Sequence, residues 1–436
     1  MTVLSLPKSR RRVERLRVRR FRKLVRRAYQ KSVFYRDLYD SAGVRPRDIR
    51  RIEDLDRLPF VQREDLRRVL ERDPASLYTR RVTKRYWTQT TSGSTGVPIT
   101  IAATRWERRR ILLGILRTYR IAGMSFFDRH IVIKDPIDIR SQAFIERFGL
   151  LRHRYFSIYD PMPEILAEIS VEPRAAILRS MPSDLANLVQ TAESNGIRFP
   201  LPRLVFSDSE TLDKPTRNSI ENFFGTPVLD FYANTETGIA AFQTPDSNGR
   251  YLIPEDLVIL ETVTNPLLQD GDTDIVLTGL LNRTTPIIRY RIGDVADGRV
   301  CRDQGAPFSN IDGVHGKYLD FLVRTDGSIV SSHAAKQNLT HVPGIEKFQV
   351  QQQEIGRVVI RIQRASDWLD STEVRIRSDF ARDFGSDTEI NIEFVESLSK
   401  ETNNYRKFKV VESKVSQELL TSNPCSSEMN STKNVP

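Results

Sequence analysis

Cysteine and histidine are scarce in this sequence, which limits the kinds of site it can form. Only two cysteines occur among 436 residues, Cys301 and Cys425, and they lie far apart. Neither a disulfide framework nor a cysteine-based zinc site follows from this pattern, and a reducing, cytoplasmic setting is expected. The five histidines show no spacing typical of metal ligands.

Long apolar segments and targeting signals are also absent. The longest apolar candidate, Ile111–Leu116, is far too short to span a membrane. The basic N-terminus is not followed by an apolar stretch and a small-residue cleavage site, so we predict no secretory signal peptide. At 436 residues the chain can form two or three domains, and its composition is typical of a globular protein.

Positive charge is concentrated at the N-terminus. Residues 1–50 hold seventeen Lys/Arg and four Asp/Glu, a net charge of +13, whereas the whole chain carries +11. Four apolar residues recur there at the spacing of one helix face, which predicts a basic helix over residues 8–31: Phe21, Leu24, Val25 and Ala28. This helix could be a solvated surface helix docked on the protein, or it could contact an anionic membrane surface or a polyanion.

The middle of the chain alternates between two kinds of pattern. Helical patterns cover residues 105–119, 181–194 and 214–224, and short apolar strands cover residues 130–134, 204–207 and 228–232. Such alternation is typical of an α/β fold with parallel sheets. From residue 251 to 290 the pattern becomes β-rich, with strands expected over 257–260, 273–280 and 286–291. We therefore predict an additional antiparallel sheet on the α/β core.

The region beyond Gly316 reads as a smaller α+β unit. Strands are expected over 320–324, 347–353, 357–364 and 389–395, and helices over 332–339 and 373–384. This β-α-β-β-α-β order describes a compact two-layer unit. We predict an N-terminal domain over residues 1–319, a small C-terminal domain over 320–415 and a disordered tail over 416–436.

The most informative local feature is the run Thr91–Gly96, followed by Val97 and Pro98. Glycines let the backbone approach an anion and adopt positive φ. Successive N–H groups and hydroxyls can then point at one phosphate. A flexible turn would have the same composition, so the rest of the chain has to decide between the two interpretations.

Two later motifs end predicted strands. Tyr232-Ala233-Asn234-Thr235-Glu236 offers an aromatic ring for a purine and a carboxylate for Mg²⁺, at the strand end where α/β sheets bind ligands. Tyr290-Arg291-Ile292-Gly293-Asp294 offers a turn carboxylate that can accept hydrogen bonds from two ribose hydroxyls. Each motif alone could be an ordinary loop.

Two further motifs lie at the small unit. Gly316–Leu322 falls at the expected domain junction, where a glycine and a polar residue suit a hinge. Asn404–Lys409 follows the last expected strand and carries a lysine at the tip of a loop. A plain linker and a surface basic cluster are the alternatives for these two segments.

In this order and spacing, the motifs resemble those of the adenylate-forming superfamily of acyl- and aryl-CoA ligases. The similarity is to the phenylacetate-CoA ligase branch, with its capsule-biosynthesis and coenzyme F390 synthetase-like members. It extends over nearly the whole chain, including Phe34-Tyr35-Arg36, Ala42-Gly43-Val44 and Leu58-Pro59-Phe60. The resemblance implies a large N-terminal domain of parallel α/β sheets with a β subdomain, and a small mobile C-terminal domain.

The resemblance also implies a role for individual residues. ATP phosphates would be held by five loop residues: Ser92, Gly93, Ser94, Thr95 and Gly96. Tyr232 would stack on adenine, with the backbone at Ser209 and Glu210 lining the base. Glu236 would bind Mg²⁺, and Asp294 would hold the ribose hydroxyls. Asp320 would be the hinge, and Lys407 would enter the cleft to stabilise the carboxylate and the α-phosphate. Thr95, Glu236 and Lys407 would thus be the catalytic group.

Three departures from the family pattern affect the loop, the hinge and the lid. Val97 stands where the phosphate loop often has a lysine. Lys317 stands where the hinge often has an arginine that would help bind the nucleotide, and a lysine cannot reproduce a bidentate guanidinium contact. Arg406 precedes Lys407 where glycine is usual, so Lys409 is an alternative for the lid lysine.

The expected function is AMP-forming activation of a small, aromatic carboxylic acid, followed by transfer to CoA, with ATP and Mg²⁺ as cofactors. Transfer to an amine or hydroxyl acceptor, or a nucleotide-binding partner protein that has lost catalysis, are the alternatives. A homodimer and contact with an anionic membrane surface through residues 1–31 are compatible with each of these. A nucleic acid is not expected as a partner.

Overall fold

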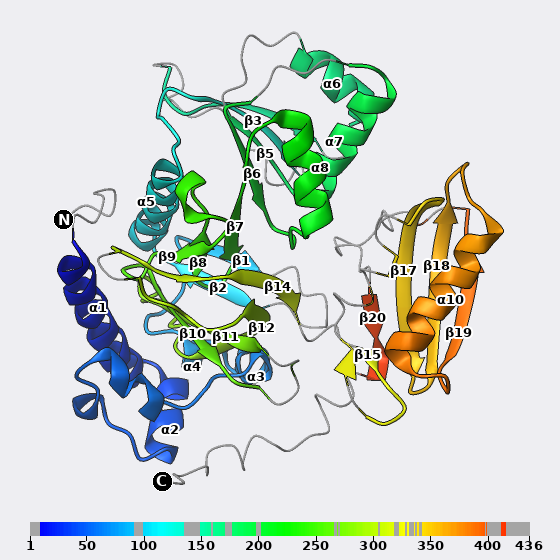
Figure 1. Cartoon of the computed structure of the whole chain (residues 1–436). Helices are drawn as coiled ribbons and strands as arrows, with labels where there is room; N and C mark the ends of the chain where they lie inside the picture. Colours follow the sequence, from blue (N-terminus) through cyan, green and yellow to red (C-terminus); the bar gives the residue numbers. More distant parts are fainter. Residues whose placement is uncertain are drawn as a thin grey trace.

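The structure is a computed structural model of the whole chain (Figure 1). The residues it describes are 9–90, 99–134, 149–157, 160–170, 177–197, 202–265, 268, 271–303, 306–317, 322–327, 329–330, 335, 338–339, 342–396, 398 and 411–415. The side chains of residues 316, 317 and 329 are outside this description.

A large mixed sheet organises the first part of the molecule, with strand order β13-β9-β8-β7-β6-β5-β3-β4. Its parallel half consists of β3 (Arg129–Lys134), β4 (Arg152–Ser157), β5 (Ile177–Ser180), β6 (Leu204–Asp208) and β7 (Val228–Asn234). Its antiparallel half consists of β8 (Gly238–Phe242), β9 (Tyr251–Ile253) and β13 (Ser309–Ile311). Four helices belong to the same region: α5 (Arg105–Ile121), α6 (Met162–Ser170), α7 (Pro182–Ser194) and α8 (Lys214–Phe224).

The sequence explains where these helices begin and end. The carboxylate of Asp213 caps α8 by accepting a hydrogen bond from the Thr216 N–H at 2.7 Å, and Gly225 ends the helix in the left-handed conformation. Helix α5 begins with a reciprocal capping box between Thr104 and Glu107. Apolar strand residues such as Val205 are fully buried, as expected for parallel strands covered on both faces.

A second, antiparallel sheet has the order β10-β11-β12-β14. Its strands are β10 (Val258–Val263), β11 (Asp272–Gly279), β12 (Tyr290–Asp297) and β14 (Gly313–Lys317). A short hairpin of β1 (Trp87–Thr90) and β2 (Thr100–Ala103) contacts the segment between β11 and β12, where the Ala102 N–H donates to Thr285 Oγ1 at 3.0 Å. Helices α1 (Arg10–Lys31), α2 (Val33–Ser41), α3 (Arg63–Arg72) and α4 (Pro74–Leu77) share one hydrophobic core with this sheet (Figure 1).

The C-terminal part is a separate unit with its own core. Its sheet has the order β19-β18-β17-β20, formed by β17 (Ile345–Glu354), β18 (Arg357–Arg364), β19 (Glu389–Phe394) and β20 (Val411–Ser413). Helix α10 (Asp370–Phe384) packs on it through Ile376, Phe380 and Phe384, which are buried. A short hairpin of β15 (Leu322–Val323) and β16 (Ile329–Val330) precedes this sheet.

The predicted α/β fold class is confirmed, including the additional antiparallel sheet and the separate C-terminal α+β unit. The expected strand over residues 286–291 is wrong in its first part, because β12 begins only at Tyr290. Arg289 has a positive φ of 47°, a left-handed conformation uncommon for a residue with a side chain, and it interrupts the extended backbone before Tyr290. Among the described helices, each is too short or too polar to cross a membrane. The expected tail over residues 416–436 lies outside the described residues.

Candidate active site

Part of the predicted site lies outside the described residues. This applies to the phosphate loop with Ser92, Gly93, Ser94, Thr95 and Gly96, to the hinge residue Asp320, and to both lysines considered for the lid, Lys407 and Lys409. The backbone of Lys317 is described and pairs with Asp294 across β14 and β12. The remaining predicted residues can be placed.

The two sheets meet at Tyr232 and Asp294. Tyr232 lies near the carboxyl end of β7 in the large sheet, and Asp294 lies in β12 of the antiparallel sheet. The Tyr232 hydroxyl donates a hydrogen bond to Asp294 Oδ2. Burial, reinforced by the neighbouring carboxylate, raises the pKa of Tyr232 well above its ordinary value, so the phenol stays protonated and remains a donor. Two motifs that are 62 residues apart in the chain therefore form one site.

Glu236 is held in the tight turn between β7 and β8. Asn234 Oδ1 accepts hydrogen bonds from the Thr237 N–H at 2.7 Å and the Thr237 hydroxyl at 3.0 Å, which closes the turn. Gly238 follows with a φ of 84°, where a side chain would be strained. Glu236 is buried, and the Tyr290 hydroxyl lies 3.4 Å from its Oε1. The turn thus directs a buried carboxylate toward the antiparallel sheet.

Asp294 owes its position to an irregular start of β12. Arg289, before the strand, donates hydrogen bonds to Glu261 and to the Leu58 carbonyl oxygen. Its guanidinium and that of Arg291 lie 4.1 and 4.4 Å from the centre of the Phe60 ring. Gly293 then adopts a φ of 85°, next to the register shift that begins at Asp294. The Leu58-Pro59-Phe60 segment therefore supports the strand that carries Asp294.

Asp274 is a further acidic residue of this region that the sequence did not single out. It is completely buried on β11, and neither of its carboxylate oxygens meets a hydrogen-bond donor among the described residues. Arg291 Nε lies 3.4 Å from its Oδ2. Burial, against the opposing effect of the Arg291 guanidinium and with a smaller contribution from the Asp294 carboxylate, raises the pKa of Asp274 to about 7. Only the antiparallel pairing of β11 and β12 brings Asp274 to Asp294, so no motif could reveal it.

Ser209 and Glu210 follow β6, on the side of the sheet where ligand sites of α/β folds lie. Ser209 has a φ of 75°, a conformation uncommon outside glycine, and its hydroxyl donates to Asp208 Oδ1 at 2.8 Å. Arg179 donates to Asp208 Oδ2 at 2.7 Å. The Ser183 N–H at the start of α7 donates to Glu210 Oε2 at 3.3 Å. The strained turn after β6 is thus fixed from two sides.

A second group of side chains that could hold a cation lies where β11 begins and β12 ends. Ligand atoms of Asp272, Asp297 and His315 lie within 4.8 Å of one another. They come from three adjacent strands, with Asp272 directly opposite Asp297. The hydrogen bond to Asp297 raises the pKa of His315. The sequence predicted no histidine with metal-ligand spacing, and this grouping depends on strand pairing rather than on spacing along the chain.

Sequence comparison finds one matching family model and several related proteins. Residues 322–414 match the family model described as the CapK C-terminal domain. The chain is 25% identical over 332 residues to phenylacetate-coenzyme A ligase of Escherichia coli, which covers 71% of this chain and 72% of that protein. It is 23% identical over 214 residues to protein CapK of Staphylococcus aureus, which covers 48% of this chain and 46% of CapK.

Structural comparison decides the fold. The structure of a 2-hydroxyisobutyryl-CoA ligase with 2-HIB-AMP, in the postadenylation state, matches with a TM-score of 0.73 and 17% identity. The match covers 96% of this chain and 94% of that ligase. This chain has the fold of the adenylate-forming CoA ligases. An anthranilate-CoA ligase with anthranoyl-AMP matches less closely, with a TM-score of 0.53 over 77% of this chain and 66% of that ligase. The predicted resemblance to the adenylate-forming superfamily is therefore confirmed.

Proposed function

We propose that this chain activates a small carboxylic acid with ATP, forming an acyl-adenylate and pyrophosphate, and then transfers the acyl group to CoA. The observation that carries the proposal is the meeting of Tyr232, Glu236 and Asp294 at one junction of the two sheets. The aromatic ring can stack on adenine, and the buried carboxylate can bind Mg²⁺. The turn carboxylate can accept hydrogen bonds from the ribose hydroxyls. The relatives named phenylacetate-coenzyme A ligase support the same activity.

The acidic surroundings suit a bound cation. Three buried carboxylates, Glu236, Asp274 and Asp294, belong to this region, and each interacts with Tyr232 or Tyr290. In this proposal Glu236 holds Mg²⁺. A cation held there would offset the repulsion between the attacking carboxylate and the ATP phosphates. Asp294 accepts hydrogen bonds from the ribose hydroxyls, and the Tyr232 ring stacks on adenine.

The phosphate loop and the lid complete the proposed site. Ser92, Gly93, Ser94, Thr95 and Gly96 would bind the phosphates through backbone N–H groups and hydroxyls. Since Val97 supplies no cation, the lysine that bridges both reactants would come from the small domain, as Lys407 or Lys409. Rotation of residues 320–415 about Asp320, next to Lys317, would present that lysine for adenylation and then withdraw it.

An aromatic acid is the proposed substrate class. The similar proteins act on phenylacetate, according to their names, and a solved neighbour holds anthranoyl-AMP. Another neighbour holds 2-HIB-AMP and CoA together, which supports CoA as acceptor. Transfer to an amine is the second candidate, favoured by a match to indoleacetate–lysine synthetase at 25% identity over 122 residues. A homodimer, a cytoplasmic location and a catalytically lapsed nucleotide-binding role remain predictions.

Acid-dependent exchange of labelled pyrophosphate into ATP tests the proposal. A panel of aryl, arylacetic and short aliphatic acids should give exchange with at least one aromatic acid. Lys407→Ala should abolish that exchange, while Lys409→Ala should preserve it; the reverse result would assign the lid role to Lys409. Retained ATP binding without exchange for any acid would favour the lapsed, nucleotide-binding alternative.

A further inference from the structure

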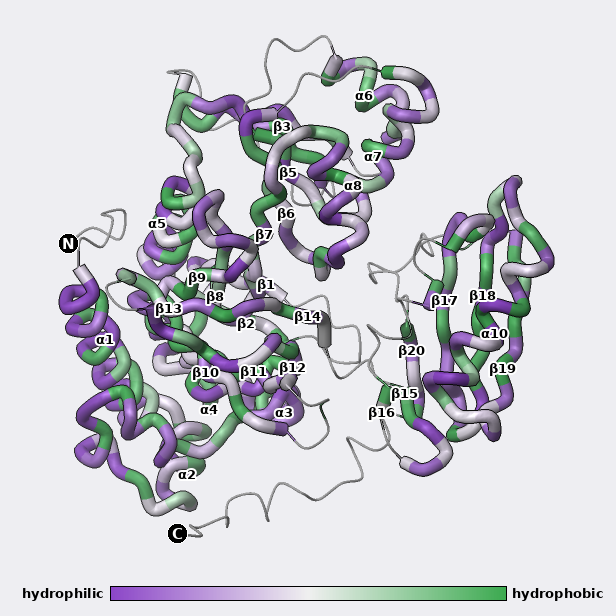
Figure 2. Tube along the Cα trace, in the orientation of Figure 1, coloured by the Kyte–Doolittle hydropathy of each residue, from purple (hydrophilic) through white to green (hydrophobic). Residues whose placement is uncertain are grey.

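Helix α1 carries all of the net positive charge of this protein. Its 22 residues contain ten Arg, two Lys and one Glu, a net charge of +11, which equals the formal net charge of the whole chain. Figure 2 shows a largely hydrophilic helix with short hydrophobic segments along it. Eight of its twelve basic residues form two sets that face in opposite directions.

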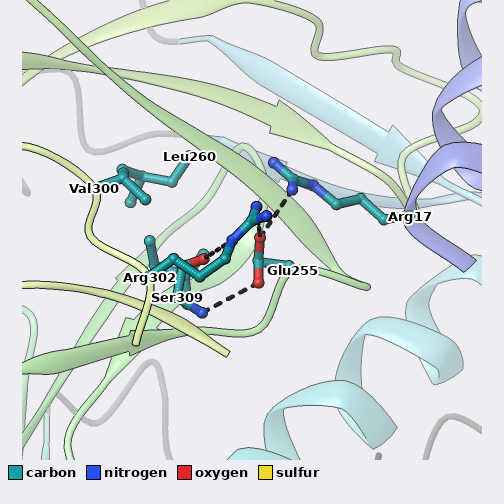
Figure 3. Close-up of a pocket in the computed structure, with 7 residues that line it drawn as sticks. Arg17, Glu255, Leu260, Val300, Arg302 and Ser309 are labelled. Carbon is teal, nitrogen blue, oxygen red and sulfur yellow. Dashed lines mark hydrogen bonds and ion pairs between the residues drawn. The ribbon is translucent and has the colours of Figure 1, made fainter. Parts of the chain in front are cut away.

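The inward set fastens the helix to the protein. Arg10 and Arg17 both form ion pairs with the buried carboxylate of Glu255. Figure 3 shows Arg17 and Arg302 directed at this carboxylate, which also accepts a hydrogen bond from the Ser309 N–H at 3.1 Å. The apolar residues of the same helix face are buried: Val13, Phe21, Leu24, Val25 and Ala28.

The neighbouring carboxylate, Asp256, fixes the helix in the same way. Its Oδ2 lies 3.1 Å from Arg20 Nη1 on α1, and Arg117 of α5 binds both of its oxygens. Glu255 and Asp256 therefore form ion pairs with the inward arginines and offset their positive charge. The orientation of α1 is set by these contacts and leaves its opposite face directed at solvent.

The outward set forms an exposed cationic stripe along the helix. Its members are Arg15, Arg19, Arg22, Lys23 and Arg26. Among the described residues, no acidic group forms an ion pair with Arg19, Arg22, Lys23 or Arg26. Several of these residues are like-charged neighbours at i, i+4, an arrangement that by itself destabilises a helix. A 22-residue helix is about 33 Å long, so the stripe presents an extended surface of one sign.

We propose that this stripe binds the surface of an anionic lipid bilayer. Charge complementarity with phosphate and carboxylate headgroups supplies the attraction, and guanidinium groups match the geometry of phosphate oxygens. The apolar face of α1 is buried in the protein, so the helix cannot insert into the acyl region as a free amphipathic helix would. The contact is consequently peripheral and electrostatic, and it weakens as salt screens it.

The composition of the stripe favours a lipid surface over a nucleic acid. The stripe has no aromatic side chain on which a base could stack, and Gln30, one turn after Arg26, is the single amide side chain of α1 that could read a base edge. A set of exposed cations along one straight face matches a flat array of charges. The experiment below therefore compares binding to a lipid surface with binding to a nucleic acid.

Sedimentation with large vesicles tests the proposal on the full chain. Wild-type protein should bind vesicles containing 30% phosphatidylserine or phosphatidylglycerol at low salt, and it should dissociate from them at about 0.5 M NaCl. It should not bind vesicles of pure phosphatidylcholine. Replacing Arg15, Arg19, Arg22, Lys23 and Arg26 with Gln removes five charges and keeps good helix formers. Since each basic residue near an anionic surface contributes about fivefold, binding should fall at least about a hundredfold.

A matched control removes five exposed charges from the C-terminal unit, by Gln substitutions at Lys347, Arg357, Arg375, Arg377 and Arg382. This variant should bind vesicles within about threefold of wild type, and circular dichroism should show that both variants are folded. Equal vesicle binding by the α1 variant and wild type would overturn the proposal. A duplex DNA fragment that binds wild type more tightly than the vesicles, at equal salt, would overturn it as well.

Discussion

The hydroxyl group of Tyr232 donates a hydrogen bond to the carboxylate of Asp294, and this contact joins the two sheets of the N-terminal part. Each residue belongs to a motif with a separate expected role, one for adenine and one for ribose. Their contact means that the two roles are coupled, because one oxygen of Asp294 is already engaged. A ribose must share this carboxylate with Tyr232 or displace the phenol from it.

The first prediction concerns this contact. Asp294→Ala removes the acceptor for the ribose hydroxyls and should weaken ATP binding by about 10- to 100-fold, which is the loss expected for a charge-assisted hydrogen bond. Tyr232→Phe keeps the ring and frees Asp294 Oδ2, so ATP binding should change by less than about fivefold. Isothermal titration calorimetry with a nonhydrolysable ATP analogue measures both. A larger loss for Tyr232→Phe than for Asp294→Ala would contradict the assigned roles.

The second prediction concerns Glu236 and Mg²⁺. Glu236→Gln keeps the size of the side chain but removes the negative charge that would hold the cation. We expect the rate of pyrophosphate exchange to fall by about 100-fold or more and the Mg²⁺ concentration at half-maximal rate to rise. Glu193→Gln is the control, since Glu193 is an exposed residue of α7 with no role in the proposed site. An unchanged Mg²⁺ dependence in Glu236→Gln would remove Glu236 from the metal site.

The third prediction concerns stability and the buried carboxyl of Asp274. Burial raises its pKa to about 7 in the folded state, whereas an unfolded aspartate has a pKa near 3.9. The folded state therefore holds a proton that the unfolded state releases, and stability is lost as pH rises from about 4 through about 7. Asp274→Asn should stabilise the protein at pH 8 by on the order of 1–4 kcal/mol.

Thermal unfolding of Asp274→Asn at pH 8 and at pH 4.5 measures this effect. The gain in melting temperature should be largest at pH 8 and should shrink toward acid pH, where the native carboxyl is protonated. Asp246→Asn is the matched control, because Asp246 is exposed and its substitution should change stability little at either pH. A gain that is equal at both pH values would show that the Asp274 carboxyl does not titrate as described.

The fourth prediction concerns Glu107 at the start of α5. This buried carboxylate accepts hydrogen bonds from the Thr104 N–H at 2.8 Å, the Arg283 N–H at 3.0 Å and the Thr284 hydroxyl at 2.6 Å. Glu107→Ala leaves these donors unsatisfied and should cost about 2–4 kcal/mol. Urea unfolding should show a lower midpoint at constant slope. Glu168→Ala, which breaks an exposed ion pair with Arg154, should cost less than about 1 kcal/mol.

Much of the fold could be predicted from the sequence because the local signals were strong. Helix α8 is bounded by Asp213 and Gly225, and both act as caps in the structure. The apolar face of α1 is buried as its spacing indicates. These elements depend on residues three or four positions apart, which a sequence displays directly.

The features that could not be predicted depend on pairing between segments that are distant in the chain. Asp274 reaches the site only through the register of β11 against β12, and the Asp272–Asp297–His315 group needs three adjacent strands. The start of β12 was wrongly placed because Arg289 adopts positive φ, which its side-chain type does not suggest. The docking of α1 likewise depends on Glu255 and Asp256, more than 230 residues away in the chain.

The most direct test of the proposed chemistry traces the carboxylate oxygen atoms of the acid substrate with an isotope label. The acid that supports exchange is prepared with ¹⁸O in its carboxylate and incubated with ATP, Mg²⁺ and CoA, and the products are analysed by mass spectrometry. If the carboxylate attacks the α-phosphorus, AMP should carry one ¹⁸O atom and the acid should appear as its CoA thioester. Label in inorganic phosphate together with ADP, or unlabelled AMP, would contradict an acyl-adenylate mechanism.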